Sequence, residues 1–245
     1  MTQPSEGPEA PLTLQRSFWN DWNGTTRERE LPDVSLRQRE VVLNWIARLG
    51  RRDLDIIDIG CGSGWLCGAL TEFGKVTGTD LADEVLARAS MRVPEARFVA
   101  GDFMTLDLPR DAYDVAVCLE VLSHVADQPA FLHKIATLLH PRGYLMLATQ
   151  NRPILERNNV PPPRPGQLRR WVDARELRTL LSADFQVIAL FTVSPIGNRG
   201  VLRLVNSYKL NRLVRLFVGN HFERLKEKMG LGWTLMALSR TGASP

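Results

Sequence analysis

Short apolar runs alternate along the chain with segments whose apolar residues recur every three or four positions. The first run, at residues 54–59, is long enough for one buried strand. Six further runs predict strands at residues 76–79, 97–99, 113–119, 144–149, 185–193 and 232–239. Helical spacing predicts helices at residues 35–49 and 131–140, the second ended by Pro141-Arg142-Gly143. This alternation is typical of an α/β fold with a mostly parallel sheet.

Three glycines at alternate positions follow the first predicted strand directly. The sequence is LDIIDIGCGSGWL, and a helical pattern begins at Trp65. A strand, a glycine turn and a helix build a ligand crevice at the carboxyl end of a parallel strand. Gly60 and Gly62 would let the backbone approach a ligand, because neither carries a Cβ. A dinucleotide motif would need its third glycine at Trp65, and no Gly-Lys-Ser/Thr follows for a phosphate loop.

Two later strands also end in acidic residues. Asp80 stands some twenty residues beyond the glycine turn, where a carboxylate accepts hydrogen bonds from both hydroxyls of a ribose. This signal fits NAD and S-adenosylmethionine (AdoMet) equally. Asp102 and Phe103 follow the third predicted strand. Three successive strand–helix units would therefore contribute to one crevice.

The pattern D-x-G-x-G-x-G at residues 58–64 resembles motif I of the class I AdoMet-dependent methyltransferases. The resemblance covers about residues 35–240 and continues through Asp80, Asp102 and the residues after strand four. It implies a Rossmann-like, doubly wound, seven-stranded sheet with strand seven antiparallel. It also implies AdoMet as methyl donor and S-adenosylhomocysteine (AdoHcy) as product. No D…D-N cluster like that of metal-dependent catechol methyltransferases stands out, so no metal is expected.

The same resemblance assigns cofactor contacts to residues at the carboxyl ends of the strands. In the family, the residue after the second acid lies against the adenine, the third acid accepts from the adenine amino group, and the next residue packs on the ring. The backbone after strand four faces the methionine. The residues of this chain in those positions are Asp58, Gly60, Cys61, Gly62, Gly64, Asp80, Leu81, Asp102, Phe103, Leu119 and Glu120.

Residues 120–125, EVLSHV, resemble the E-V-x-x-H-V stretch of methyltransferases of the ubiquinone-biosynthesis type. If a helical turn begins there, Glu120 and His124 are neighbours on one face, and His124 could act as a general base. A purely structural histidine is the alternative. Relatives also fold an N-terminal segment over the cofactor, and Arg37 or Arg39 could meet its carboxylate; a solvated helix face is the alternative for these two.

Four segments follow from this interpretation. Residues 1–34 would be a tail and cofactor-covering segment that includes the aromatic cluster FWNDW at 18–22, and 35–195 the AdoMet-binding core. Residues 196–231 would form a basic helical insertion, and 232–245 the last strand and tail. Within the core, the stretch VPPPRPG at 160–166 predicts a stiff lid over the acceptor site.

Charge is concentrated in the predicted insertion. The chain carries a net +4, whereas residues 196–231 hold eight Lys or Arg and two Asp or Glu, a net +6. The rest of the chain is therefore 4 − 6 = −2. Two short helices broken near residues 207–209 fit this segment better than one straight helix. It could roof the acceptor pocket, touch an anionic membrane surface or form a homodimer contact.

Composition and length fit one α/β domain of a cytoplasmic protein. The 245 residues are 44% hydrophobic and 24% charged, with no apolar run of about 18 residues for a membrane span and no leader pattern at the start. Three cysteines at unrelated spacings indicate reduced thiols. Peripheral membrane contact through the basic insertion stays open.

These observations predict an AdoMet-dependent methyltransferase, most simply an O-methyltransferase. A hydroxyl of a small-molecule, sugar or lipid-linked acceptor would attack the methyl group by in-line displacement. The alternatives are a non-catalytic AdoMet-binding regulator and an NAD(P)-dependent oxidoreductase, and Trp65 argues against the second. Nucleic acid is not an expected partner, because no N-P-P-[YF] box or recognition motif is present.

Overall fold

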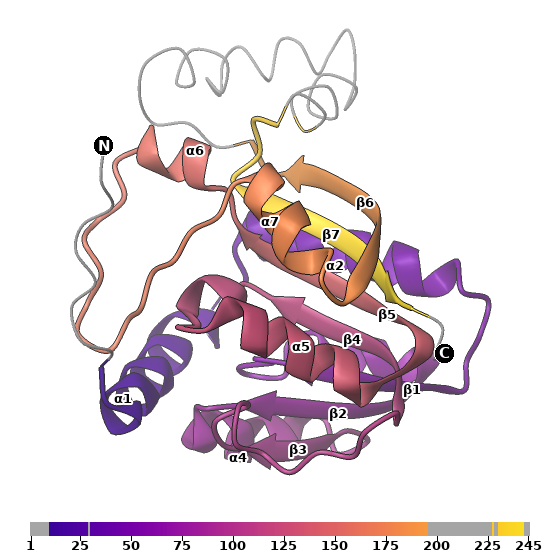
Figure 1. Ribbon diagram of the computed structural model, residues 1–245. Helices are drawn as coiled ribbons and strands as arrows, with labels where there is room; N and C mark the ends of the chain where they lie inside the picture. The colour runs from indigo at the N-terminus through magenta and orange to yellow at the C-terminus, as the bar shows by residue number, and fades with distance from the viewer. Residues whose placement is uncertain (1–9, 29, 196–226, 228–229, 243–245) are drawn as a thin grey trace, which may run out of the picture.

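The computed structural model describes residues 10–28, 30–195, 227 and 230–242. Seven strands form one sheet in the order β3-β2-β1-β4-β5-β7-β6 (Figure 1). Strands β1 to β5 pair in parallel, whereas β7 lies between β5 and β6 and runs antiparallel to both. The strands are β1 (Leu54–Ile59), β2 (Gly74–Asp80), β3 (Arg97–Ala100), β4 (Tyr113–Leu119), β5 (Leu139–Gln150), β6 (Phe185–Val193) and β7 (Thr234–Thr241). The predicted fold class is confirmed, including the antiparallel last strand.

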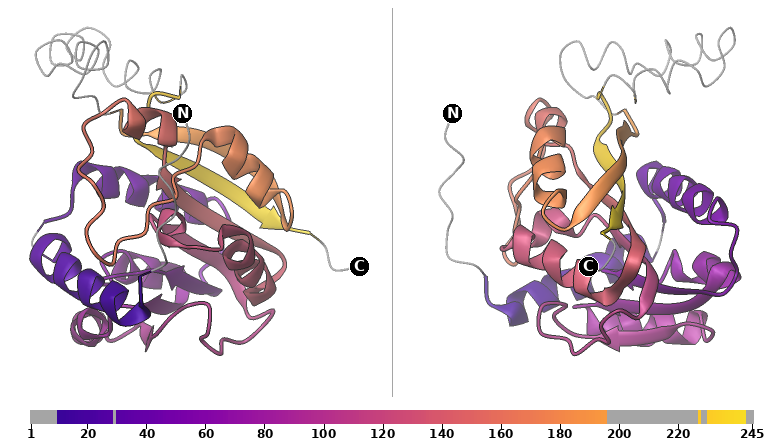
Figure 2. Two further views of the ribbon diagram at one scale, coloured as in Figure 1. Left: turned by 60° about the vertical axis from the view of Figure 1, so that its left-hand side comes forward. Right: turned by 45° about the vertical axis from the view of Figure 1, so that its right-hand side comes forward.

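Helices cover both faces of the sheet (Figure 2). Helices α2, α3 and α4 pack on one face, and α5 and α7 on the other. The α-helices are α1 (Leu12–Trp22), α2 (Asp33–Ala47), α3 (Cys67–Leu70), α4 (Asp83–Arg92), α5 (Gln128–Leu138), α6 (Arg152–Glu156) and α7 (Ala174–Leu181). Three single turns are η1 (Asn23–Arg27), η2 (Thr71–Phe73) and η3 (Leu122–His124).

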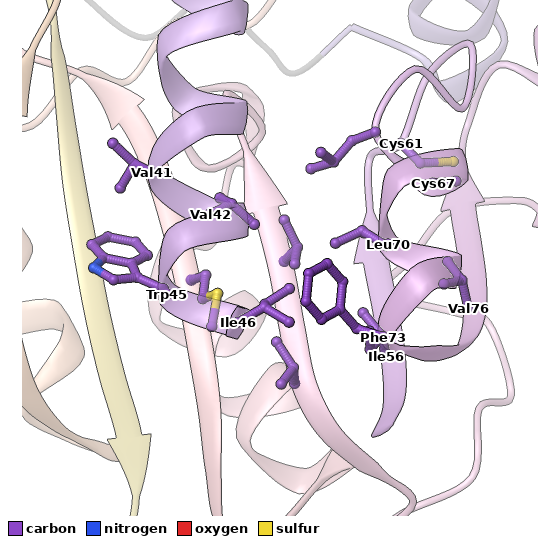
Figure 3. Packing of buried hydrophobic residues seen from close by; sticks show 14 of the residues in the cluster. Val41, Val42, Trp45, Ile46, Ile56, Cys61, Cys67, Leu70, Phe73 and Val76 are labelled. Atoms are coloured by element: carbon purple, nitrogen blue, oxygen red, sulfur yellow. The ribbon is translucent and has the colours of Figure 1, made fainter. Parts of the chain in front are cut away.

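The central strands are apolar on both faces, because both faces are covered. Ile56 of β1 faces α2 and α3, where it packs with Val42, Ile46 and Leu70 (Figure 3). Its neighbour Ile57 points to the opposite side, into the cluster under α5 and α7. If polar and apolar residues alternated strictly along β1, one face of the sheet would be polar. The run LDIIDI instead has apolar residues on both faces, which specifies a sheet covered by helices on both sides.

Local signals fix where the covering helices begin. The Asp127 carboxylate accepts a hydrogen bond of 3.0 Å from the Ala130 N–H at the start of α5. Asp173 and Glu176 form a reciprocal capping box at the start of α7. Phe131 and Leu177 then enter the buried cluster beneath.

The helix predicted at residues 131–140 is present as α5, but its predicted end and stop were wrong. Helix α5 ends at Leu138, and β5 begins at Leu139, five residues before the expected start of that strand. Leu139 is buried and pairs with Tyr113, so pairing with β4 competes with another helical turn. Pro141 to Gly143 therefore lie inside β5 beside an irregularity in register, with Arg142 at φ +66°.

The basic insertion predicted at residues 196–231 lies almost wholly outside the described residues, which include only 227, 230 and 231 of it. Its two predicted helices and its proposed uses stay predictions. No helix in the described part of the chain is long and apolar enough to cross a bilayer.

Candidate active site

A cavity of about 870 Å³ opens at the carboxyl edge of the sheet, within the usual range of small-molecule sites. One side, here called the strand-end wall, is made by residues at the ends of five parallel strands: Ile59, Asp80, Gly101, Leu119 and Gln150. The other side, here called the cover, is made by residues 10–23 and by the strap, residues 160–171, which runs beside α1 (Figure 1). Parallel strands bring their carboxyl ends to one edge, as the sequence predicted.

The glycine turn is shaped by its protein neighbours. Gly60 has φ +71°, and a Cβ there would lie 2.1 Å from Cγ2 of Val121. Gly62 has φ +52°, and a Cβ there would lie 2.8 Å from Oδ1 of Asn23. Both glycines line the cavity. Both positions therefore require glycine because of the positive φ and the close side chains of Val121 and Asn23, in addition to the expected approach of a ligand.

Asp80 ties this turn to β2. Its carboxylate accepts hydrogen bonds of 2.8 Å from the N–H groups of Gly62 and Ala82, one on each oxygen. Burial raises the pKa of Asp80, and these two backbone hydrogen bonds oppose that shift. Each oxygen keeps a further lone pair for another donor. Asp80 lines the cavity and is placed where it could accept from a diol.

Leu81, Asp102 and Phe103 line the same part of the cavity. Asp102 accepts a hydrogen bond of 3.0 Å from the Met104 N–H, which holds its turn in shape. The Phe103 ring packs edge-on against Phe131 with 5.1 Å between centroids. The structure therefore brings together the acids and apolar residues that the spacing suggested.

Three predicted cofactor residues lie under the cavity and do not line it. Asp58 and Cys61 are buried, and the Cys67 thiol lies 3.4 Å from an Asp58 oxygen. Burial raises the pKa of Asp58 to about 7. A Cβ on Gly64 would lie 3.1 Å from the Phe98 ring. These residues support the glycine turn from below.

Beyond β4, the chain turns through Glu120 at φ +63°. Its carboxylate accepts from Nε2 of Gln38 at 2.5 Å and from the Thr234 hydroxyl at 2.9 Å. The predicted pairing of Glu120 with His124 does not form, because this left-handed residue and the short turn η3 replace a helical turn. Glu120 instead joins α2 and β7 at the base of the cavity.

His124 contacts the strap. Its Nδ1 lies 2.6 Å from the Leu168 carbonyl oxygen. A carbonyl only accepts, so Nδ1 carries the hydrogen and Nε2 has the lone pair. Burial lowers the pKa of His124 to about 4, and Arg169 also opposes its protonation. A neutral imidazole therefore lines the cavity, with the Trp19 ring 4.8 Å away.

Sequence reasoning missed Gln38, whose side chain is fully buried and lines the cavity. Its Oε1, like the Thr79 hydroxyl and Oε1 of Gln150, has no hydrogen-bond partner among the described residues. These three oxygens could accept hydrogen bonds from a ligand. The sequence does hold a sign of Gln38. This residue precedes Val41, Val42 and Trp45 by three, four and seven residues, so it is a polar residue on the apolar face of α2.

Neither arginine suggested for the cofactor carboxylate lines the cavity. Arg37 instead pairs with Glu227 at 2.8 Å and Glu40 at 2.7 Å, and Arg39 is exposed. Because both carboxylates already hold the Arg37 side chain, that interpretation was wrong for Arg37. The pair with Glu227 joins α2 to the segment before β7.

Residues 10–23 of the cover are held on one side by α4 and the glycine turn and on the other side by the strap. On one side, the Asn20 amide donates to Asp83 of α4 at 2.9 Å, and Asn23 meets the glycine turn. On the other, the strap packs on α1 so closely that a Cβ on Gly166 would lie 2.7 Å from the Leu14 carbonyl oxygen. Among the described residues, no group of three His, Cys, Asp or Glu side chains could hold a metal ion; the expectation of no metal stays a prediction.

Comparison with known families gives one match over most of the chain. Residues 35–190 match a family described as "Methyltransferase domain". A relative, the ubiquinone biosynthesis O-methyltransferase of Rhodopseudomonas palustris, is 36% identical over 104 residues. That alignment covers 40% of this chain and 41% of the relative, so it spans less than half the length of either protein.

Solved structures share the fold along nearly the whole chain. The 1,6-didemethyltoxoflavin-N1-methyltransferase of Burkholderia thailandensis has a TM-score of 0.66 at 20% identity, covering 99% of this chain and 93% of its own. A methyltransferase of Haloferax volcanii, solved in complex with the Trm112 activator, has a TM-score of 0.64 at 18% identity, with coverage of 91% and 97%. At these identities the likeness concerns the fold.

Proposed function

The chain belongs to the methyltransferase domain family, and we propose that it is an AdoMet-dependent methyltransferase acting on a hydroxyl of a small-molecule, sugar or lipid-linked acceptor. The observation that carries the proposal is the strand-end wall. It gathers the glycine turn, Asp80, Asp102 and Phe103 around one cavity. Each of these residues has the chemistry that a part of AdoMet requires.

The residues present fit the cofactor. Asp80 has lone pairs left for the ribose hydroxyls, and Asp102 and Phe103 offer an acceptor and a ring edge beside Leu81 for the adenine. At the other end of the wall, the buried oxygens of Gln38 and Gln150 suit the ammonium of the methionine portion. The cofactor then supplies a methyl group on a positively charged sulfur.

The protein's own task is alignment and exclusion of water, because the donor is already activated. The cover and the strand-end wall enclose the cavity from two sides. The Nε2 lone pair of His124 would accept the hydrogen bond of the acceptor hydroxyl, orient its oxygen toward the methyl group and take the proton that this oxygen loses on methylation. A pKa of about 4 makes this imidazole a stronger orienting group than base.

The proposal is tested with AdoMet carrying a radiolabelled methyl group, incubated with the protein and a cell extract and then partitioned between organic and aqueous phases. Label in the organic phase indicates a lipid-linked or quinone-like acceptor, and label in the aqueous small-molecule fraction indicates a sugar or other metabolite. The Asp102→Ala variant is the control and should transfer less label. No AdoHcy binding by calorimetry would overturn the proposal.

A non-catalytic AdoMet-binding regulator is the second candidate, because the cofactor-binding part of the cavity would be the same. AdoHcy binding without label transfer to any extract fraction would favour it. The NAD(P)-dependent oxidoreductase is disfavoured by Trp65, which lines the cavity where a dinucleotide motif requires glycine. A thermal-shift panel of AdoHcy, NAD and NADP separates these two classes of ligand.

A further inference from the structure

Arg169 brings a guanidinium to the lining of the cavity. Its side chain donates to the Pro161 carbonyl and, at 2.9 Å, to Oε1 of Gln167, both within the strap. Among the described residues, no carboxylate pairs with it, and these two bonds use only two of its five N–H groups. Burial lowers the pKa of Arg169. A half-buried cation without an acid beside it is costly unless a ligand supplies the opposite charge.

The backbone around Arg169 is fixed. Arg170 donates its N–H to the Ser123 carbonyl at 2.7 Å, and its own carbonyl accepts from the Gln128 amide at 2.9 Å. On the other flank, the Leu168 carbonyl accepts from His124 at 2.6 Å. The strap is thus fastened to η3 on both sides of Arg169. Arg169 also lies near enough to His124 for its charge to oppose protonation of the imidazole.

The surroundings of this charge are aromatic. The guanidinium carbon lies 5.7 Å from the Trp171 ring centroid, and the Trp19 ring lies 4.8 Å from that of His124. Both tryptophans line the cavity. A flat ring of a ligand packs well on tryptophan side chains such as these. A carboxylate can accept two parallel hydrogen bonds from the planar guanidinium of an arginine.

We propose that Arg169 is the specificity-determining residue for the acceptor, and that the acceptor is a hydroxylated ring compound with a carboxylate that pairs with Arg169. The inference rests on the proposed function and narrows its substrate class. Arg169 neighbours His124, and its hydrogen bonds and its contact with Trp171 all lie within the strap, away from the glycine turn and the strand ends. The acceptor carboxylate is therefore a better partner for it than the carboxylate of the cofactor.

The test uses calorimetry on the full chain saturated with AdoHcy. The probes are two matched pairs, salicylate with salicylamide and 4-hydroxybenzoate with 4-hydroxybenzamide, which differ in charge but hardly in shape. We expect at least one acid to bind roughly ten- to a hundredfold more tightly than its amide, as a charge-assisted hydrogen-bonded pair predicts. Arg169→Gln should bring this ratio close to one, and Arg169→Lys should keep part of it.

Arg164→Gln is the matched control, since Arg164 is an exposed arginine of the same strap; it should leave the ratio unchanged. Equal binding of acids and amides to the wild type, or no binding of any acid, would overturn the inference. So would an Arg169→Gln variant that binds AdoHcy more weakly and keeps the ratio, because Arg169 would then serve the cofactor.

Two further readouts keep the result interpretable. Loss of AdoHcy binding by the wild type would be a failure of the proposed function, whereas normal AdoHcy binding without preference for acids is a failure of this inference alone. If Arg169→Gln does not fold, the wild type decides: added sodium chloride should weaken binding of the acid and leave that of the amide unchanged. Equal salt dependence would overturn the inference.

Discussion

The strand-end wall and the cover enclose one cavity but are built in different ways. The wall comes from strand ends that the parallel sheet must bring together, and backbone groups shape it, as in the Gly62 N–H bond to Asp80. The cover comes from residues 10–23 and the strap, which meet only in the folded protein, as where Gly166 packs on Leu14. We infer that the wall serves the cofactor common to the family and the cover serves the acceptor of this protein.

The strongest way to break this division is to disturb the wall at Gly60. Gly60→Ala forces a side chain into φ +71° and against Val121, at a cost of about 2–5 kcal/mol in the free energy of unfolding. AdoHcy binding should be lost with it. Urea denaturation and calorimetry measure both effects.

Gly50→Ala is the control for Gly60→Ala, because Gly50 has φ +67° but a Cβ at that position would meet nothing within 4 Å. It should cost only about 1–2 kcal/mol, the strain of a left-handed residue. Equal costs at the two positions would mean that the contact with Val121 is unimportant.

A change at His124, the residue of η3 that contacts the strap, should act on turnover alone. His124→Ala removes the group that orients the acceptor hydroxyl, and we expect kcat to fall by about 10²-fold or more while the AdoHcy affinity is kept. His133→Ala, at an exposed histidine of α5, is the control. A loss of less than tenfold would mean that His124 is a structural residue that holds the strap in place.

Asp80→Ala, unlike His124→Ala, should weaken the binding of AdoHcy. Without the carboxylate, the ribose hydroxyls lose their acceptor and the Gly62 N–H loses its partner, so AdoHcy binding should weaken by about 1–3 kcal/mol. Glu95→Ala, at an exposed acid near β3, should change nothing. Unchanged AdoHcy affinity of Asp80→Ala in calorimetry would sink the assignment of the wall to the cofactor.

The smallest expected effect is a pH dependence beneath the wall. Burial raises the pKa of Asp58 to about 7, so the folded state holds a proton that the unfolded state releases near pH 4. The contribution to stability is full below that pH and is lost as the pH rises through 7. Between pH 6 and pH 8 the loss is about 1.4 kcal/mol.

Urea denaturation at these two pH values measures the Asp58 effect. Asp58→Asn keeps an acceptor for the Cys67 thiol but does not titrate, so it should lack this loss. Identical pH profiles for the two proteins would contradict the raised pKa. The lowered pKa of His124 works in the other direction, with stability lost as the pH falls from 6.5 toward 4.

The wall was predictable from the sequence and the cover largely was not. The strand ends follow from apolar runs, and Gly60, Asp80 and Asp102 recur at the spacing of successive strand–helix units, so local chemistry and sheet topology place them. Arg169 and Gln38 reach the cavity through packing between distant segments. No local pattern specifies such a meeting, although the polar Gln38 on an apolar helix face was a usable sign.

Local reasoning failed where pairing with a distant strand decided the conformation. The helix expected through His140 ends early because Leu139 pairs with β4. The helical turn expected from Glu120 does not form, because Glu120 has a left-handed backbone, and its carboxylate contacts Gln38 and Thr234 instead of His124. In both cases the residues that make these contacts are distant in the sequence, so the local spacing of apolar residues could not predict them.

The contact between Gly166 and Leu14 joins two segments that are synthesised at different times. Helix α1 leaves the ribosome before the strands of the sheet, and the strap that packs on it follows only about 150 residues later. Until then Trp19 lacks the strap as a packing partner. The cavity therefore cannot be closed while the chain is growing through β1 to β5, because the strap is synthesised after every strand end of the wall.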